Sequence, residues 1–338
     1  MTGPRAPKLG LVLPDDQPVD EDIRAARLAE DAGFSTIWCY ELSRDSQVRA
    51  ACVAQHTTRI DVGTCVSLWH STPVATAMRV AEIQRWSGGR FVFGLGVGTE
   101  ASSRDHHDTP YSRPVGRMRE YLQIVQGSWR ASADLPLSFD GHSFNVQNFS
   151  GADLAGHPMP PVLLAAMGPA MVRLAFTGAD GVVLSPSATP RYTEDVVHPP
   201  YRELMRTRAA AGHPVRTVAV ARCSIDSDRQ AARERARRSI AWYARLPAHA
   251  RIAEMHGFGA EAAVISAAWD RGDPNGAVAA VSNEMVETFS LAGTPDDVRR
   301  AIRRWDGVVD SLALMTPTEG ASADEISANV VAIAESLA

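Results

Sequence analysis

Lysine is almost absent from this chain of 338 residues, because every one of its 34 basic residues except Lys8 is arginine. No Gly-Lys-Ser/Thr sequence occurs, which excludes a Walker-type phosphate loop. Lys8 opens the first expected strand, at the end opposite the expected site, so Schiff-base and pyridoxal mechanisms are excluded too. Any phosphate group has to be bound without lysine.

Cysteine is also scarce, and Cys39, Cys52, Cys65 and Cys223 form no CxxC pair. This spacing argues against a structural zinc site and against a disulfide framework, so we expect free thiols packed as small apolar side chains. No apolar run reaches membrane-spanning length, and no apolar signal segment begins the chain. The net charge of −5 does not suggest the basic surface that nucleic-acid-binding proteins have. We expect a cytoplasmic protein that binds neither nucleic acid nor membrane.

Short apolar strands alternate with helical segments along the whole chain. Strands that are apolar on both faces are typical of parallel sheets covered by helices. The expected strands are residues 8–13, 34–40, 59–66, 90–98, 162–166, 181–184, 217–225 and 308–315. The helices expected between them include residues 73–86, with proline at the start, and residues 192–211. Eight such units predict an α/β fold, a (β/α)8 TIM barrel that forms a single domain over residues 1–338.

Two segments break this rhythm, and we expect them to be insertions after strands four and seven. Residues 131–160 carry prolines and glycines typical of an inserted hairpin or surface loop. Residues 228–290 are rich in alanine and arginine and are expected to be largely helical. A doubly wound sheet is the competing fold, but it needs a GxGxxG turn after the first strand, and Pro14-Asp-Asp16 stands there instead.

The stretch from Gly88 to Glu100 is the one around which the rest of the chain is organised. Its glycines Gly94, Gly96 and Gly98 alternate with bulky residues on a strand, with no helix expected directly after them. One face of that strand then lacks side chains, so a flat ligand or another backbone can approach closely. A carboxylate just beyond this bare face stands where a reacting group would sit.

Six short sequences, in order along nearly the whole chain, resemble the luciferase-like monooxygenase superfamily, particularly its branch of coenzyme F420-dependent oxidoreductases. They are residues 29–38, 57–64, 88–98, 165–169, 179–182 and 292–295. The resemblance implies a barrel with an insertion after strand seven, a homodimer formed through the early helices, and hydride transfer between the deazaflavin F420 and a small organic substrate. Two alternatives stay open: an FMN-dependent monooxygenase that uses oxygen and a partner flavin reductase, and a non-catalytic flavin-binding barrel.

The resemblance also implies which residues hold the cofactor. The family binds its ring across the strand ends, often beside a non-prolyl cis peptide, and that position falls at Cys65–Val66. Its phosphate site matches Met167–Gly168, where backbone N–H groups open a helix that begins at Pro169. The expected cofactor-binding residues are Glu41, Cys65, Val66, Gly96, Gly98, Met167 and Gly168.

Proton transfer is the point at which the sequence departs from the family. Glu100 matches a carboxylate that certain F420-dependent dehydrogenases place near the ring. A desolvated glutamate there can hold a proton near neutral pH, whereas a solvated loop carboxylate is the alternative. The family commonly has histidine after the acidic residue that Glu41 matches, but Leu42 stands here. Candidates for the missing base are His70, after strand three, and His106 or His107, after strand four.

Two further groups near these strand ends have more than one interpretation. The sequence Asp105-His-His-Asp108 would suit a metal, but no third ligand at a fixed spacing supports one, so we expect no metal site. Trp69, Tyr40 and Tyr111 are expected either to form aromatic walls for a planar ring or to pack in the core.

Overall fold

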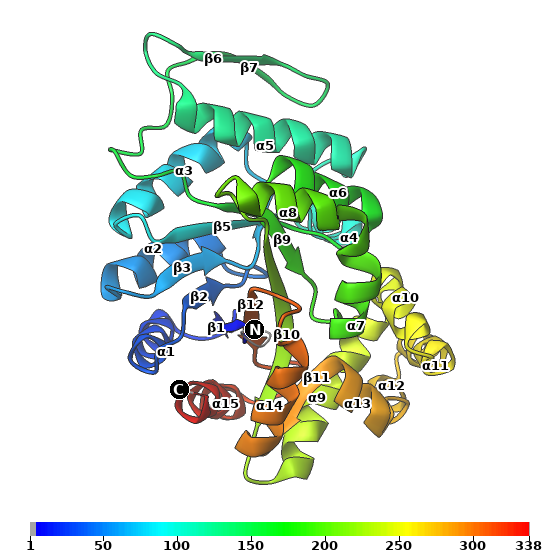
Figure 1. The fold of residues 1–338 in the computed structure, drawn as a ribbon. Helices are drawn as coiled ribbons and strands as arrows, with labels where there is room; N and C mark the ends of the chain where they lie inside the picture. The colour runs from blue at the N-terminus through cyan, green and yellow to red at the C-terminus, as the bar shows by residue number, and fades with distance from the viewer. Residues whose placement is uncertain (1–4, 338) are drawn as a thin grey trace.

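The computed structural model describes residues 5–337, in which eight parallel strands close a barrel (Figure 1). Each strand pairs with the next, and the last pairs with the first, so no barrel strand is left at an edge. In spatial order the strands are β1 (Lys8–Leu13), β2 (Thr36–Cys39), β3 (Asp61–Thr64), β5 (Phe91–Gly96), β8 (Val162–Ala165), β9 (Gly181–Leu184), β10 (Arg216–Ile225) and β12 (Ser311–Met315). The predicted TIM barrel is confirmed, and the doubly wound sheet is excluded.

The inside of the barrel is filled by side chains, and the indole of Trp38 on β2 is one of the largest of them. A Cβ atom added to Gly10 on β1 or to Gly63 on β3 would come within 2.5 Å of that indole. These two glycines therefore provide the space for one large aromatic residue. Lys8 lies at the opposite end of the barrel from the strand carboxyl ends, exposed at the start of β1.

Helices cover the outside of the barrel and begin where the sequence offers caps. The Asp45 side chain accepts hydrogen bonds from the first turn of one helix, Thr72 does so for the next, and Pro73 stands at that second helix's first position. The helices outside the second insertion are α1 (Val19–Asp31), α2 (Ser46–His56), α3 (Pro73–Trp86), α4 (Glu100–Asp105), α5 (Pro114–Arg130), α6 (Pro169–Gly178), α7 (Pro190–Tyr192), α8 (Arg202–Ala210), α14 (Pro295–Ile302) and α15 (Ala323–Ser336).

The first insertion is the antiparallel hairpin of β6 (Leu137–Asp140) and β7 (Asn145–Phe149), and it lies along α5 at the top of Figure 1. It follows the helix of the fourth unit rather than the fourth strand itself. Arg117 of α5 holds it in place, because the guanidinium carbon lies 5.3 Å from the ring of Phe144 and 5.0 Å from the ring of Trp69. The hairpin is thereby connected to the loop that contains Trp69.

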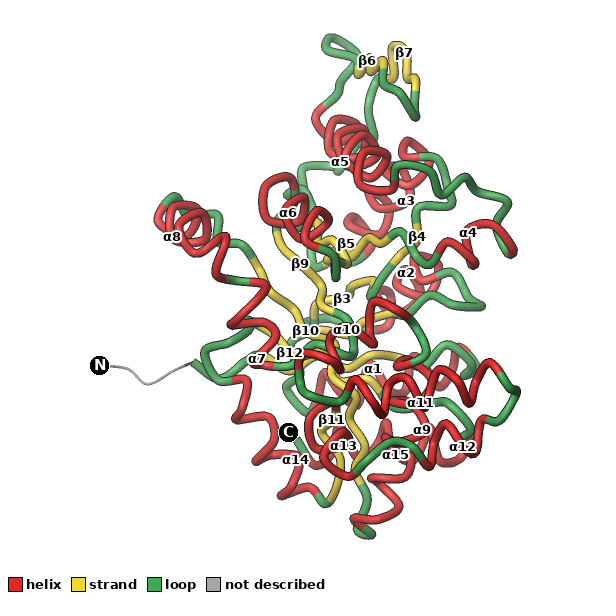
Figure 2. Tube along the Cα trace, turned by 90° about the vertical axis from the view of Figure 1, so that its right-hand side faces the viewer, coloured by secondary structure: helices red, strands yellow, loops and turns green. Residues whose placement is uncertain are grey.

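The second insertion is helical, as predicted, and it ends in a strand that the sequence analysis missed. Its helices are α9 (Arg229–Ala244), α10 (Pro247–Met255), α11 (Gly259–Asp270), α12 (Pro274–Ala279) and α13 (Asn283–Phe289). Figures 1 and 2 both place them at the lower end of the molecule, away from the hairpin. Strand β11 (Ser290–Gly293) then pairs with the carboxyl-terminal part of β10.

Two expectations about local structure are wrong, and one short strand was not expected. A helix, α4, does follow the glycine strand directly. Residues 192–211 do not form one helix, because a π-helical turn at Thr193–Val197 and a 3₁₀ turn at Pro199–Tyr201 separate α7 from α8. A two-residue strand, β4 (Ser67–Leu68), interrupts the loop after β3. Within residues 5–337, no helix combines the length and apolar character needed to cross a membrane.

Candidate active site

The residues predicted to bind cofactor follow β2, β3, β5 and β8, so the barrel brings them to one rim. In a parallel barrel all strands end on the same face, which is where TIM-barrel enzymes carry their active sites. Glu41 follows β2, Cys65 and Val66 follow β3, Gly98 follows β5, and Met167 and Gly168 follow β8.

The bare face of β5 is covered by the segment at the end of β3, by the Thr64 backbone at Gly94 and by the Val66 side chain at Gly96. A Cβ atom at Gly94 would overlap the carbonyl oxygen of Thr64, and one at Gly96 would lie 2.6 Å from Cγ2 of Val66. The Thr64 hydroxyl also donates to the Gly94 carbonyl at 2.6 Å. Alternating glycines allow the close approach of a flat ligand or of another part of the chain, and here Thr64 and Val66 of the chain itself lie against them.

The segment that fills this space has a cis peptide bond between Cys65 and Val66, at the position where the resemblance places one. After this bond the chain pairs again with β5, with Ser67 opposite Leu95. Burial raises the pKa of the Cys65 thiol to about 12, so this cysteine is a packed thiol and not a thiolate nucleophile.

Glu41 ties the loop after β2 to this segment. One carboxylate oxygen accepts from the Leu68 backbone N–H at 2.9 Å, and the other accepts from the Ser46 hydroxyl at 2.5 Å. Burial raises the pKa of Glu41, while these hydrogen bonds oppose the rise. Leu42, which replaces the family histidine, is 62% exposed and contributes no proton-transfer group.

The histidines predicted as replacements are only partly brought together. The rings of His70 and His107 are stacked with centroids 3.7 Å apart, and His70 Nε2 lies 3.2 Å from the Ser103 hydroxyl. Burial, then the neighbouring His107 and Arg117, lower the pKa of His70 to about 4. His106 is exposed, and its ring centroid lies 6.3 Å from that of His107.

At neutral pH His70 is therefore uncharged and can accept a proton. Its Nδ1 is buried and has no hydrogen-bond partner among residues 5–337. Glu100, in contrast, is exposed in the first turn of α4. The structure places it as a solvated carboxylate, the second of the two forms considered above.

The aromatic residues predicted as walls lie in different surroundings. Trp69 is fully buried, and the ring of Tyr111 meets it edge-on at 5.9 Å. Tyr40 is partly buried and packs against the barrel's inner cluster, as Val66 and the helix residue Trp242 also do. Trp69 is thus a core residue, while Tyr40 is the aromatic side chain that borders the strand ends.

The start of α6 is open to anions. Gly168 precedes the helix with no side-chain cap, is exposed, and has no heavy atom within 4 Å of the position that a Cβ would take. The Tyr192 hydroxyl fixes the preceding residue by donating to the Met167 carbonyl at 2.9 Å. Unpaired N–H groups and the helix dipole favour a phosphate at such a terminus without any lysine.

The opposite side of the rim contains a buried cation that the sequence analysis missed. The guanidinium of Arg222 on β10 donates from Nε to the Ser239 hydroxyl and from Nη1 to the Pro186 carbonyl, at 3.1 and 2.6 Å. It also lies 4.6 Å over the ring of Tyr243. A lone arginine in the otherwise apolar strand 217–225 was the signal that could have identified it.

Two histidines of the insertion dock onto the loop after β9. His249 Nδ1 lies 2.8 Å from the Ser187 hydroxyl, and His256 Nε2 lies 2.8 Å from the Thr189 hydroxyl. Burial, then the charge of Arg222, lower the pKa of His249 to about 3, so this side chain is neutral. The second insertion is thereby fastened to the rim by polar contacts.

Comparisons with known proteins give one coherent result. A family model described as luciferase-like monooxygenase matches residues 5–311. The sequence is 30% identical over 308 residues to the 5,10-methylenetetrahydromethanopterin reductase of Archaeoglobus fulgidus, covering 86% of this chain and 87% of that protein.

Solved structures share the fold along the whole chain. The coenzyme F420-dependent tetrahydromethanopterin reductase from Methanopyrus kandleri has a TM-score of 0.81 at 22% identity, over 98% of both chains. A type II Baeyer–Villiger monooxygenase from Pseudomonas putida, in complex with FMN, has a TM-score of 0.65 at 17% identity, also over 98% of both chains.

Proposed function

The chain belongs to the luciferase-like monooxygenase family, and from this premise we propose that it binds coenzyme F420 and transfers a hydride between the deazaflavin and a small organic substrate. The observation that carries the proposal is its 30% identity, along 86% of its length, to a methylenetetrahydromethanopterin reductase. When bound, the coenzyme supplies the hydride donor or acceptor. Residues at the barrel rim would bind the coenzyme, orient its ring and transfer protons.

The phosphate of the cofactor fits the start of α6. The backbone N–H groups of Gly168 and Ala170 have no partner among the described residues, whereas Pro169 has no N–H and those of Met171 and Val172 donate to the Gly168 carbonyl. A Cβ at Gly168 would meet only open space. On the ring side, Val66 and the backbone of Cys65 form a surface supported from behind by Gly94 and Gly96. We propose that Glu41 orients this surface through its hydrogen bond to Leu68, and that Gly98 allows the turn beyond it.

We assign proton handling to His70, because its imidazole is neutral at pH 7 and its Nδ1 has no hydrogen-bond partner among residues 5–337. Its lowered pKa makes it a weak base, so it would pass a proton on rather than retain it. Exposed Glu100 and His106 remain candidates for a role once substrate covers the rim. Because Leu42 stands where the family commonly has a histidine base, another group must transfer the proton.

We also propose that the protein forms a homodimer through its early helices. Val48 on α2 and Met78 on α3 are 64% and 51% exposed, and Trp86 at the end of α3 is 52% exposed. Large apolar side chains gathered on adjacent helices are typical of an interface. A charged substitution, Val48→Glu, should convert a dimer to a monomer in size-exclusion chromatography with light scattering.

The deciding experiment is a fluorescence titration of the purified protein with coenzyme F420 and, separately, with FMN. Binding of the deazaflavin alone, with a Kd in the micromolar range or tighter, supports hydride transfer. Tight binding of FMN alone would move the case to oxygen chemistry with a partner flavin reductase. If neither F420 nor FMN binds, both F420-dependent hydride transfer and FMN-dependent monooxygenation are contradicted.

A matched pair of variants tests the phosphate position. Ala170 is exposed in the first turn of α6, where an aspartate stabilises the helix but repels a bound anion. Ala170→Asp should weaken cofactor binding at least about tenfold, roughly 1.4 kcal/mol, while Ala170→Asn should change it little. Equal affinities for the two variants would remove the start of α6 from the site.

A further inference from the structure

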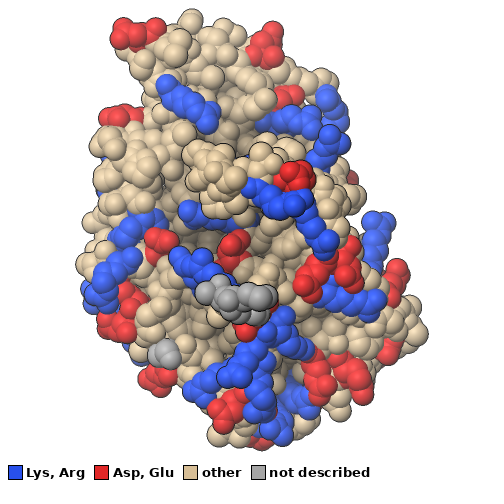
Figure 3. Space-filling view, viewed as in Figure 1, with Lys and Arg blue, Asp and Glu red and all other residues tan. Residues whose placement is uncertain are grey.

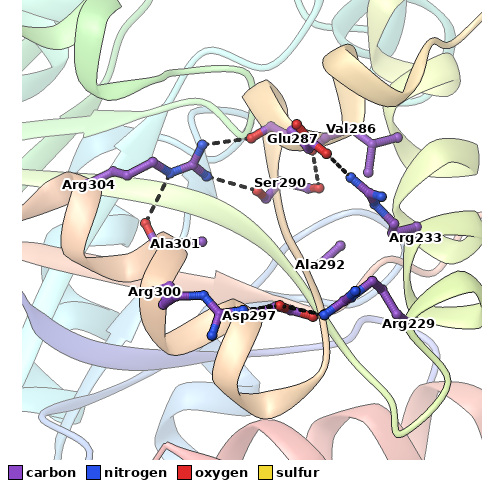
Figure 4. A pocket seen from close by; sticks show the side chains of 10 residues that line it. All are labelled: Arg229, Arg233, Val286, Glu287, Ser290, Ala292, Asp297, Arg300, Ala301 and Arg304. Carbon is purple, nitrogen blue, oxygen red and sulfur yellow. Dashed lines mark hydrogen bonds and ion pairs between the residues drawn. The ribbon is translucent and has the colours of Figure 1, made fainter.

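A hollow of about 520 Å³ lies between α9, α13 and α14, apart from the loops of the candidate active site (Figure 4). Strand β11 crosses it, and among residues 5–337 this strand pairs only with β10. Arginine side chains enter the hollow from both walls: Arg229 and Arg233 from α9, Arg300 from α14, and Arg304 from the turn after it. Figure 3 shows basic side chains gathered over this same lower region of the molecule.

Two of these arginines share a single carboxylate. Arg229 donates to both oxygens of Asp297, at 2.7 and 3.0 Å, and Arg300 pairs with the same group. Asp297 is fixed in turn because its carboxylate accepts from the backbone N–H and hydroxyl of Thr294. The hydrogen bonds from Arg229, ahead of those from Thr294, hold the pKa of Asp297 well below its usual range. One negative charge thus faces two positive charges.

The other pair of arginines repeats this imbalance. Arg233 pairs with Glu287. Arg304 donates only to backbone carbonyls, those of Ala301, Glu287 and Ser290, at 3.2, 2.8 and 3.3 Å. Burial lowers the pKa of Arg304, as expected for a cation with no carboxylate within ion-pair distance among the described residues. Four guanidiniums therefore face two carboxylates, an excess of two positive charges.

We propose that this arginine-lined hollow binds a small phosphate-bearing metabolite. Planar guanidiniums match the oxygens of a phosphate in pairs, and a dianionic phosphate would balance the excess charge. Arg229 Nη1 and the Nε and Nη1 of Arg300 make no hydrogen bond within residues 5–337, so both walls keep donors for a ligand. The volume is in the range of small-molecule sites and exceeds what a single ion requires.

The bound phosphate would join α9 to α14 across β11. That strand pairs with β10 from Arg222 onward, and Arg222 Nη1 also lies 3.4 Å from the Phe289 carbonyl. The ligand would therefore rest on the segment that holds the buried cation of the barrel rim. This position suits an effector better than a substrate, because no group of the candidate active site lines the hollow.

The test is isothermal titration calorimetry of the full chain with inorganic pyrophosphate as the probe, comparing Arg300→Glu with Arg299→Glu. Arg299 neighbours Arg300 on the same helix but donates to Asp296 and to the Ser336 carbonyl, outside the hollow. We expect Arg300→Glu to weaken binding at least about tenfold and Arg299→Glu less than about twofold. If Arg300→Glu does not fold well enough to be titrated, Arg300→Gln takes its place. It adds no negative charge and should also weaken pyrophosphate binding.

Three outcomes would overturn the proposal. Equal weakening by the two charge reversals would mean a general surface-charge effect. Full affinity in Arg300→Glu would place the anion elsewhere, for example at the start of α6. Tighter binding of succinate than of pyrophosphate would reject phosphate as the ligand class.

Discussion

The two sides of the barrel rim are packed differently: one relies on glycines, the other on buried polar side chains. On the β3–β5 side, Gly94 lets the Thr64 backbone lie directly against β5, and Gly96 makes room for the Val66 side chain. On the β9–β10 side, Arg222 and His249 are buried polar side chains bonded to hydroxyls and carbonyls of distant segments. The first side should not tolerate an added atom, and the second should not tolerate a lost hydrogen bond.

The largest effect is expected on the glycine side. Gly94→Ala should lower the free energy of unfolding by about 3 kcal/mol or more, because its Cβ would overlap the Thr64 backbone, which cannot rotate away. Gly96→Ala should cost about 1–2 kcal/mol, since Val66 presents a side chain that can shift. Gly168→Ala, in open space at φ −79°, is the control for steric overlap and should cost about 1 kcal/mol at most, because alanine is only a poorer N-cap than glycine. Urea denaturation measures all three, and a well-tolerated Gly94→Ala would contradict the close backbone contact.

The next effect is expected on the polar side. Arg222→Met should cost about 2 kcal/mol, because it leaves the Pro186 carbonyl and the Ser239 hydroxyl without their donor. Hydrogen exchange should accelerate in α9 and α13 before the rest of the barrel. Arg216→Met, at the exposed start of the same strand, is the matched control. If hydrogen exchange accelerates uniformly over the whole barrel, Arg222 does not act locally on α9 and α13.

The pH dependence of stability provides a third and smaller test. The pKa of His249 is lowered to about 3, against about 6.5 in the unfolded chain. Between these values the unfolded chain binds a proton that the native protein does not, so stability is lost as pH falls through this window, by up to about 1.4 kcal/mol per pH unit. His249→Gln should flatten this slope between pH 6 and 5, while exposed His213→Gln should leave it unchanged. An unchanged slope in His249→Gln would show that His249 is protonated in the folded protein.

The smallest effect concerns the histidine of the glycine side. NMR titration of His70 should give a midpoint near pH 4. His107→Asn should raise that midpoint but leave it below 6.5, because burial is the larger cause and the neighbouring imidazole the smaller one. A titration midpoint near pH 6.5 in the unsubstituted protein would contradict the lowered pKa and show that His70 behaves as an ordinary loop histidine.

Much of the fold could be predicted because local signals coincide with element ends. Helix α3 and strand β9 were predicted at their observed bounds, since Pro73 begins the one and Gly181 the other. Helix α4 was missed because six residues leave no readable period. The helix expected over residues 192–211 failed because Pro199 and Pro200 interrupt its hydrogen bonding.

The site was predicted less completely than the fold, for a physical reason. The glycine strand pointed to a close approach, but whether a ligand or Val66 fills the space depends on a segment that follows another strand. The pair of His249 and Ser187 joins residues 62 positions apart, and nothing in the local sequence links them. Arg222 could have been found from its apolar neighbours, although its partners could not.

Lys8 has a practical consequence for studying this protein. It supplies the only lysine amine in the sequence, and it lies exposed at the end of the barrel remote from the rim. Amine-reactive esters modify lysine and the α-amine of a chain but leave guanidiniums unmodified, so the many arginines around the second insertion would remain intact. Attachment to a sensor surface through Lys8 would present the molecules in one orientation, with the rim facing the solution.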